Sequence, residues 1–96
     1  MPRLVWSPRA LADIARLHAF LKSNSPSAAN RAVRAIRQGV RLLATHPEAG
    51  RPADEMAPGF REWPITFGAG GYLAPYRQQG DTVVILAVRH GRERGY

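Results

Sequence analysis

TVVILAVRHGRERGY, residues 82–96, is the stretch around which the rest of the chain is organised. It begins with six consecutive apolar residues, Val83–Val88. A run this short, with no polar face, predicts a strand buried on both sides of a sheet. The residues that follow are polar and mostly cationic: Arg89, His90, Arg92, Glu93, Arg94 and Tyr96. Such groups at the end of a buried strand suit a binding or reactive site, and the alternative is a strand that leaves the core for a solvated tail.

The length and composition around this stretch restrict the class of protein. Ninety-six residues predict one domain, residues 1–96, with a single modest core. No cysteine is present, which excludes disulfides and thiolate metal sites. The three histidines are widely separated, so we expect neither a metal nor a cofactor. With no apolar signal core in MPRLVWSP and no apolar run of membrane-spanning length, we expect a soluble, cytoplasmic protein and no membrane partner.

The charge balance points to an anionic partner. The chain has 14 Lys and Arg against 7 Asp and Glu, a net charge of +7, and Lys22 is its single lysine. Arginine has a planar fork that grips carboxylate or phosphate through two hydrogen bonds. The partner is therefore a nucleic acid or an acidic protein, and charge alone does not choose between them.

Two helices are predicted before the strands, because Ser7-Pro8 and Ser25-Pro26 each pair a hydroxyl N-cap with a proline suited to the first helical position. The first helix runs until residues 23–25, with Asp13 off its apolar side. That apolar side consists of Ala10, Leu11, Ile14, Leu17, His18 and Leu21. We interpret His18 as a packed, hydrogen-bonded core residue, since no second metal ligand lies at helical spacing.

The second predicted helix ends near Thr45 and forms an antiparallel hairpin with the first. Its apolar stripe consists of Ala29, Ala32, Val33, Ile36, Val40 and Leu43. A separate arc is cationic and consists of Arg31, Arg34, Arg37 and Arg41. This arc is either a solvated face or a docking surface for an acidic partner or a nucleic acid.

The remaining strands complete an α+β fold. Residues 3–6 are predicted as a first strand and residues 60–67 as a second, with its odd-numbered side chains, Arg61 to Phe67, on one side. Pro64 favours an edge position, and Pro75 indicates a bulge in a third strand over residues 72–77. The predicted order is β-α-α-β-β-β, a two-helix antiparallel hairpin on a small, mainly antiparallel sheet.

One reaction fits the polar residues of the strands. The candidate catalytic residues are Arg61, Glu62, Arg77, Arg89, His90 and Tyr96. Such a set could cleave RNA without a metal, because cations stabilise the charge that develops on phosphorus. His90 or Glu62 would abstract the 2′-hydroxyl proton, and His90 or Tyr96 would protonate the leaving oxygen. Any basic α+β domain offers a comparable set.

Six pieces of sequence, in order, resemble the RelE/ParE superfamily of type II toxins, and its ParE branch in particular. They are SPRALADI, SPSAANRAVRAI, LLATHPEAGRP, GFREWPI, GYLAPYR and VVILAVRHGRE, spread over residues 7–93. The resemblance implies the fold predicted above and a toxin that a cognate antitoxin silences. For a basic toxin, we expect the antitoxin to supply an acidic segment that folds on binding.

The branch decides the expected target. The ParE branch implies inhibition of DNA gyrase without catalysis, whereas the RelE branch implies cleavage of mRNA in the ribosome. The absence of lysine from residues 51–62 weighs against the nuclease, and the presence of His90 and Tyr96 keeps it open. The residues predicted to bind a partner or target are Arg31, Arg34, Arg37, Arg41, Arg89 and Arg92.

Overall fold

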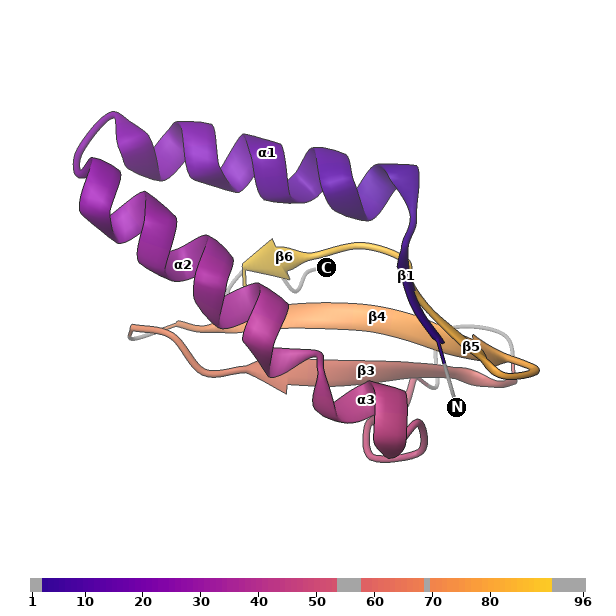
Figure 1. Ribbon diagram of the computed structural model, residues 1–96. Helices are drawn as coiled ribbons and strands as arrows, with labels where there is room; N and C mark the ends of the chain where they lie inside the picture. Colours follow the sequence, from indigo (N-terminus) through magenta and orange to yellow (C-terminus); the bar gives the residue numbers. More distant parts are fainter. Residues whose placement is uncertain (1–2, 54–57, 69, 91–96) are drawn as a thin grey trace.

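Two helices lie over one face of a mixed sheet (Figure 1). The computed structural model describes residues 3–53, 58–68 and 70–90. Its elements are β1 (Arg3–Trp6), α1 (Pro8–Lys22), α2 (Pro26–Gly39), α3 (Leu42–Thr45), β2 (Arg51–Pro52), β3 (Phe60–Ile65), β4 (Tyr72–Gln79), β5 (Thr82–Ile85) and β6 (Arg89–His90). The strand order is β1-β5-β4-β3-β2, with β6 beside β4. Among the strand pairings of the described residues, only β1–β5 is parallel. The predicted α+β class and its β-α-α-β-β-β order are confirmed.

The core lies between the helices and this face of the sheet. Both predicted helix starts are confirmed, because Ser7 Oγ accepts from Ala10 N at 3.0 Å and Ser25 Oγ accepts from Ala28 N at 3.1 Å. The buried residues that pack together are Ala10, Ala32, Ile36, Val40, Leu43, Ile65, Tyr72, Ala74, Tyr76, Val83, Ile85 and Val88. No helix in the described part of the chain has the length and apolar character needed to cross a membrane.

The second helix is shorter than predicted, because α2 ends at Gly39 and α3 is a separate turn. The Gly39 carbonyl accepts a hydrogen bond from the Trp63 indole at 2.8 Å. Leu43 N, which would bond to that carbonyl in a continuous helix, donates instead to Val40 O at 3.0 Å. A side chain from β3 therefore takes the place of a helical hydrogen bond and breaks the helix.

The predicted face of the first helix is wrong at two positions. Leu11 is 56% exposed, whereas Asp13 is only 4% exposed. Asp13 lies against the sheet because its carboxylate accepts a hydrogen bond from the backbone N–H of Val88 at 2.9 Å. His18 is half-buried, and its Nε2 lies 3.0 Å from Asn30 Oδ1 of α2. It is hydrogen-bonded as predicted, but it joins the two helices rather than lying in the core.

The last strand is divided into β5 and β6, which corrects the prediction of one strand over residues 83–88. Two residues of β4, Ala74 and Pro75, face three residues, 86–88, between the two paired segments. One extra residue therefore lies between the two paired segments, and β4 itself continues to Gln79 without the predicted bulge. Two side chains near the start of α1 bond to the segment between β5 and β6. Ser7 Oγ donates to Leu86 O at 3.0 Å, and the Asp13 carboxylate accepts from Val88 N.

A hydrogen-bonded tyrosine fixes the loop before β2. Tyr76 is fully buried, and its hydroxyl donates to Pro47 O and accepts from Gly50 N, both at 2.8 Å. A Cβ atom at Gly50 would lie 2.6 Å from the Tyr76 hydroxyl, so this close approach requires glycine. β2 pairs with only two residues of β3, Arg61 and Glu62. At Pro64 the side of β3 away from β4 is therefore an edge of the sheet, as predicted.

The Tyr76 phenol predicts a loss of stability at alkaline pH. Burial raises the pKa of Tyr76 above the ordinary value of 10.0, and burial also raises the pKa of Tyr72. As the pH rises, the unfolded chain therefore loses its tyrosine protons at a lower pH than the folded chain does. The corresponding stability is complete below about pH 10 and is lost as the pH rises through the folded-state values. Melting temperatures measured from pH 8 to 12 should fall more steeply for the wild type than for Tyr76→Phe. Parallel pH profiles would contradict this prediction.

Candidate functional site

The sheet divides the candidate catalytic residues between its two faces. Side chains of directly paired antiparallel residues lie on the same face, and successive residues alternate. Arg61 pairs with buried Tyr76, and His90 pairs with Tyr72, so both candidates lie on the helix side. The candidates on the opposite face are Glu62, Arg77 and Arg89, from their pairing with Pro75, Phe60 and Leu73. Tyr96 and Arg92 lie outside the described residues.

Glu62 is the centre of an ion-pair cluster on the face away from the helices. Its Oε1 lies 3.3 Å from Arg51 Nε of β2, and its Oε2 lies 3.6 Å from Arg89 NH2 of β6. The Glu62 side chain is 16% exposed, so the pair with Arg89 is partly shielded from water. Both carboxylate oxygens thus lie beside a guanidinium group. This arrangement joins β2, β3 and β6 across β4, and it gives Glu62 a structural role.

The other two strand arginines also have structural partners. Arg77 places its guanidinium carbon 5.8 Å from the centre of the Phe60 ring, within the range of a cation–π contact. Arg61 donates to Gly50 O at 2.7 Å and to Glu48 O at 3.4 Å, so it holds the loop before β2. Of the predicted cations on the strands, Arg89 alone is close to the candidate Glu62.

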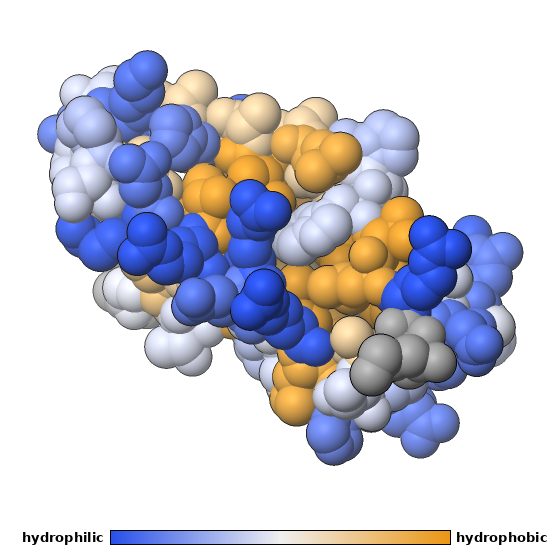
Figure 2. All heavy atoms as spheres, viewed as in Figure 1, coloured by the Kyte–Doolittle hydropathy of each residue, from blue (hydrophilic) through white to orange (hydrophobic). Residues whose placement is uncertain are grey.

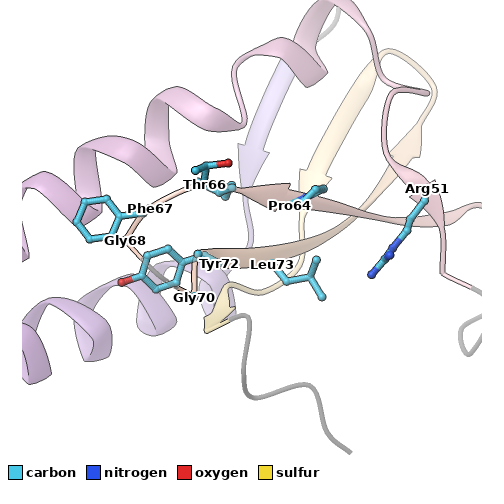
Figure 3. A pocket seen from close by; sticks show the side chains of 10 residues that line it. Arg51, Pro64, Thr66, Phe67, Gly68, Gly70, Tyr72 and Leu73 are labelled. Atoms are coloured by element: carbon cyan, nitrogen blue, oxygen red, sulfur yellow. The ribbon is translucent and has the colours of Figure 1, made fainter.

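His90 belongs to a row of rings on the helix side. Its ring meets Tyr72 edge to face at a centroid distance of 5.6 Å, and Tyr72 stacks on Phe67 at 6.0 Å. A pocket of about 330 Å³ lies beside this row at the β3–β4 turn (Figure 3). Phe67 and Tyr72 lie together at one end of this pocket, and the Arg51 side chain points toward Leu73 from the other end (Figure 3). Glycine backbone and apolar side chains make up most of the lining, and its polar side chains are those of Arg51, Thr66 and Tyr72.

A small cationic pocket contains residues that the sequence did not indicate. Arg9, Asp13 and Arg16 of α1 line this pocket of about 240 Å³ together with Arg89. Arg16 NH1 lies 2.9 Å from Asp13 Oδ1, and Arg9 Nε lies 3.9 Å from Asp13 Oδ2. The only sequence signal for this site was a lone acidic residue between apolar positions of the helix. Asp13 accepts the Val88 N–H through Oδ2, and its Oδ1 lies beside Arg16. Both carboxylate oxygens therefore have partners, so Asp13 is not placed to take a proton from a substrate.

The predicted cationic arc occupies a groove between α2 and β1. Arg34, Arg37 and Arg41 are exposed and line a groove of about 550 Å³. The other residues that line it are Leu4, Trp6, Asn30, Val33 and Gln38. Arg31 does not line this groove, and its NH1 donates to Ser27 Oγ at 2.6 Å. Arg89 lines a different pocket, so the residues predicted to bind a partner do not form one surface.

The described residues therefore offer two kinds of site. The strands hold ion pairs and aromatic stacks, and they place Glu62 and His90, the two described proton-transfer candidates, on opposite faces. The described part of the chain brings no three His, Asp or Glu residues together in a way that could hold a metal ion. The groove, in contrast, combines exposed cations with apolar side chains, a chemistry suited to binding an acidic amphipathic segment.

The comparisons match the chain to toxins that carry the names ParE and RelE. The family described as "ParE toxin of type II toxin-antitoxin system, parDE" matches residues 4–95. Toxin RelE3 of Caulobacter vibrioides is 40% identical over 94 residues, covering 98% of this chain and 99% of that protein. Putative toxin Y4kP of Sinorhizobium fredii is 34% identical, covering 96% and 91%. A solved structure titled "Chromosomal ParDE TA system from P. aeruginosa" matches with a TM-score of 0.78 and 29% identity, covering 94% of this chain and 96% of that one.

Proposed function

Because the chain belongs to the ParE toxin family of type II toxin-antitoxin systems, we propose that it arrests growth by binding DNA gyrase without itself catalysing a reaction. A cognate antitoxin neutralises it through an acidic segment that folds on the toxin surface. We name gyrase as the target because the ParE branch of the family implies it. The charge of +7 and the exposed arginines of α2 support an acidic partner.

One observation carries the non-catalytic part of this proposal. Glu62 and His90, the two candidate bases, lie on opposite faces of the sheet. Both oxygens of Glu62 are within 4 Å of an arginine nitrogen, and His90 packs edge to face on Tyr72. General acid–base catalysis needs both groups within hydrogen-bond reach of one substrate, directly or through a water. The described arrangement keeps Glu62 and His90 apart, so these two groups cannot act as base and acid on one substrate, which supports binding over cleavage. Tyr96, the other candidate acid, lies outside the described residues.

The alternative is a ribosome-dependent mRNA endonuclease. It is favoured by the presence of His90 at the predicted strand end and by the name RelE carried by relatives such as Toxin RelE3. The two functions differ in their products. A gyrase inhibitor should cause filamentation and a DNA-damage response, and it should block supercoiling by purified gyrase. An endonuclease should produce mRNA cut at the ribosomal A site.

His90→Gln separates the two functions. The change keeps a hydrogen-bonding side chain but removes an ionisable group. We expect growth arrest and inhibition of purified gyrase to change by less than about threefold, because binding needs no single proton-transfer group. A nuclease that used His90 would lose about 10²-fold or more, the usual contribution of a general acid or base.

The measurement pairs supercoiling by purified gyrase with primer extension on ribosome-bound mRNA, using the unmodified chain and the variant. Lys22→Ala is the control, because Lys22 is exposed in the last turn of α1 and is not among the residues predicted to bind a partner or target. If the unmodified chain cuts mRNA in the ribosome and His90→Gln abolishes both cutting and arrest, the gyrase proposal is wrong.

A further inference from the structure

The α1 pocket is the small cationic pocket that lies between the first half of α1 and the segment leading into β6 (Figure 1). Arg9, Asp13 and Arg16 line it on the helix side, and residues 87–89 line it on the other side. Asp13 links the two sides, because its Oδ2 accepts from Val88 N at 2.9 Å. Arg9 is one turn before Asp13 and Arg16 is about one turn after it, so both arginines reach the pocket from the same side of the helix.

The α1 pocket carries more positive than negative charge. Three arginines line it against one aspartate, an excess of two positive charges. Asp13 Oδ1 lies 2.9 Å from Arg16 NH1, whereas Arg9 Nε is 3.9 Å from Oδ2, close to the limit of an ion pair. Arg89 lies 3.6 Å from Glu62, a carboxylate that also pairs with a second arginine. The described carboxylates therefore neutralise only part of this positive charge.

One donor at the α1 pocket is buried without a partner. Among the described residues, Arg89 Nε makes no hydrogen bond, although this atom is shielded from solvent. A buried donor of this kind destabilises the protein unless an acceptor reaches it. Because Arg89 lines the pocket, an anion bound there would bring oxygen acceptors close to this side chain.

The chemistry of the lining suits a phosphate on a nucleic-acid backbone better than a small molecule. Its described uncharged residues are Ala87 and Val88, which offer neither a ring for base stacking nor a polar side chain for a base or a sugar. The Arg9 and Arg16 side chains are 79% and 61% exposed, so a phosphate on a long chain can reach them. Arginine contacts to phosphate oxygens position a protein on nucleic acid without reading its sequence.

An acidic protein segment is a poorer occupant of the same pocket. The oxygens of a phosphate are arranged tetrahedrally, so they can accept from guanidinium groups on both sides of the pocket, whereas the two oxygens of a carboxylate lie in one plane. A nucleic acid also repeats its charge at every nucleotide, and binding it releases condensed counterions. The excess charge of the pocket therefore favours a phosphate backbone.

We infer that Arg9, Arg16 and Arg89 form a phosphate-binding site that contacts the backbone of a nucleic acid. Arg9 and Arg16 donate to oxygens of one phosphate, and Asp13 holds both arginines in place, so less side-chain freedom is lost on binding. Arg89 adds positive charge from the β6 side. This inference goes beyond the proposed function and does not depend on gyrase.

The site is separate from the arginines of α2. None of the described residues that line the α1 pocket belongs to α2. On the face shown in Figure 2, hydrophilic side chains gather over α2, whereas the middle of α1 presents mainly apolar surface. Variants of the α1 pocket therefore leave the cations of α2 unchanged.

The test measures how the full chain binds a short, fluorescently labelled DNA duplex, without gyrase. Arg16→Ala should weaken binding about fivefold or more at low salt and lower the slope of log K against log salt by about one, because a phosphate contact is lost. Lys22→Ala is the matched control, since it removes the same charge from an exposed position of the same helix outside the pocket. It should weaken binding by less than about twofold. Equal losses in the two variants would show that only net charge matters and would overturn the inference.

Filling the pocket gives a second measurement that leaves the charge unchanged. Ala87→Leu places a larger side chain in the lining and should also weaken duplex binding about fivefold, because the phosphate loses its space. Ala19→Leu makes the same change at an exposed position of α1 outside the pocket and should have no measurable effect. Circular dichroism checks that the variants fold, and Arg16→Ala decides the matter if Ala87→Leu does not.

Competition by two other anions identifies the ligand. Inorganic phosphate should displace the duplex only weakly, because it has a single charged group, and poly-glutamate of equal total charge should compete about tenfold less well than unlabelled duplex. Equal competition by poly-glutamate, or binding of inorganic phosphate without binding of the duplex, overturns the inference. Because gyrase is absent, these outcomes leave the proposed function intact, and a failure to inhibit gyrase leaves this inference intact.

Discussion

Val40→Asp is expected to leave the chain unfolded at 25 °C. Val40 is fully buried where α2 ends, and it packs in the core between the helices and the sheet. Burying an unpaired carboxylate costs several kcal/mol, because the charge loses its hydration and gains no partner. A chain of this length has a total stability of about 5–14 kcal/mol, so this one change can remove most of it.

The matched control is Arg37→Ala, three residues earlier on the exposed side of α2. It should change the free energy of unfolding by less than about 1 kcal/mol, as surface substitutions usually do. Urea titration followed by circular dichroism at 222 nm measures both variants. Similar unfolding midpoints for the two would show that the helical phase assigned to residues 37–40 is wrong.

The sequence predicted the elements that depend on local signals. Serine followed by proline marks the start of α1 and α2, and a side-chain oxygen caps each helix as expected. The apolar stripe of α2 is also correct, because Ala29, Ala32 and Ile36 are buried. These features follow from hydrogen bonding within one turn and from the 3.6-residue period, both of which can be read from neighbouring residues.

The sequence could not predict features that depend on residues far apart in the chain. α2 ends at Gly39 because Trp63, 24 residues later, takes its carbonyl. The last strand divides where residues 86–88 face only two residues of β4, and where Ser7 and Asp13 bond to this segment. The strand break has no local sequence signal, and at the helix break the local signal is Gly39 alone, a residue that also occurs inside helices.

The candidate site depended on those same long-range features. Alternation along β3 already separates Arg61 from Glu62, but the face of Arg89 and His90 depends on the register of β6 with β4. One extra residue before β6 reverses the face of the sheet on which the Arg89 and His90 side chains lie. The sequence could therefore identify the six candidate residues without showing that the structure divides the five described ones between two faces.

Asp13→Ala is expected to produce the second large loss of stability. Asp13 accepts the Val88 N–H at 2.9 Å inside the protein, and Val88 is fully buried. Removing the carboxylate leaves this donor without a partner, which costs about 1–3 kcal/mol for a neutral group and more where the lost acceptor was charged. The pair with Arg16 adds little, because the Arg16 side chain is 61% exposed to water. We therefore expect the free energy of unfolding to fall by about 2–4 kcal/mol, the sum of the main loss and this small one.

Two further variants show whether this loss comes from the Val88 hydrogen bond. Asp13→Asn keeps one oxygen that can accept from Val88, so it should cost about half as much as the alanine change. Asp81→Asn is the control, because it removes a carboxylate from an exposed turn and should have an effect below about 0.5 kcal/mol. Urea denaturation gives the three stabilities, and hydrogen exchange of the Val88 amide tests the local cause. If Asp13→Ala cost no more than Asp81→Asn, the buried carboxylate would not be what holds the segment before β6 against α1.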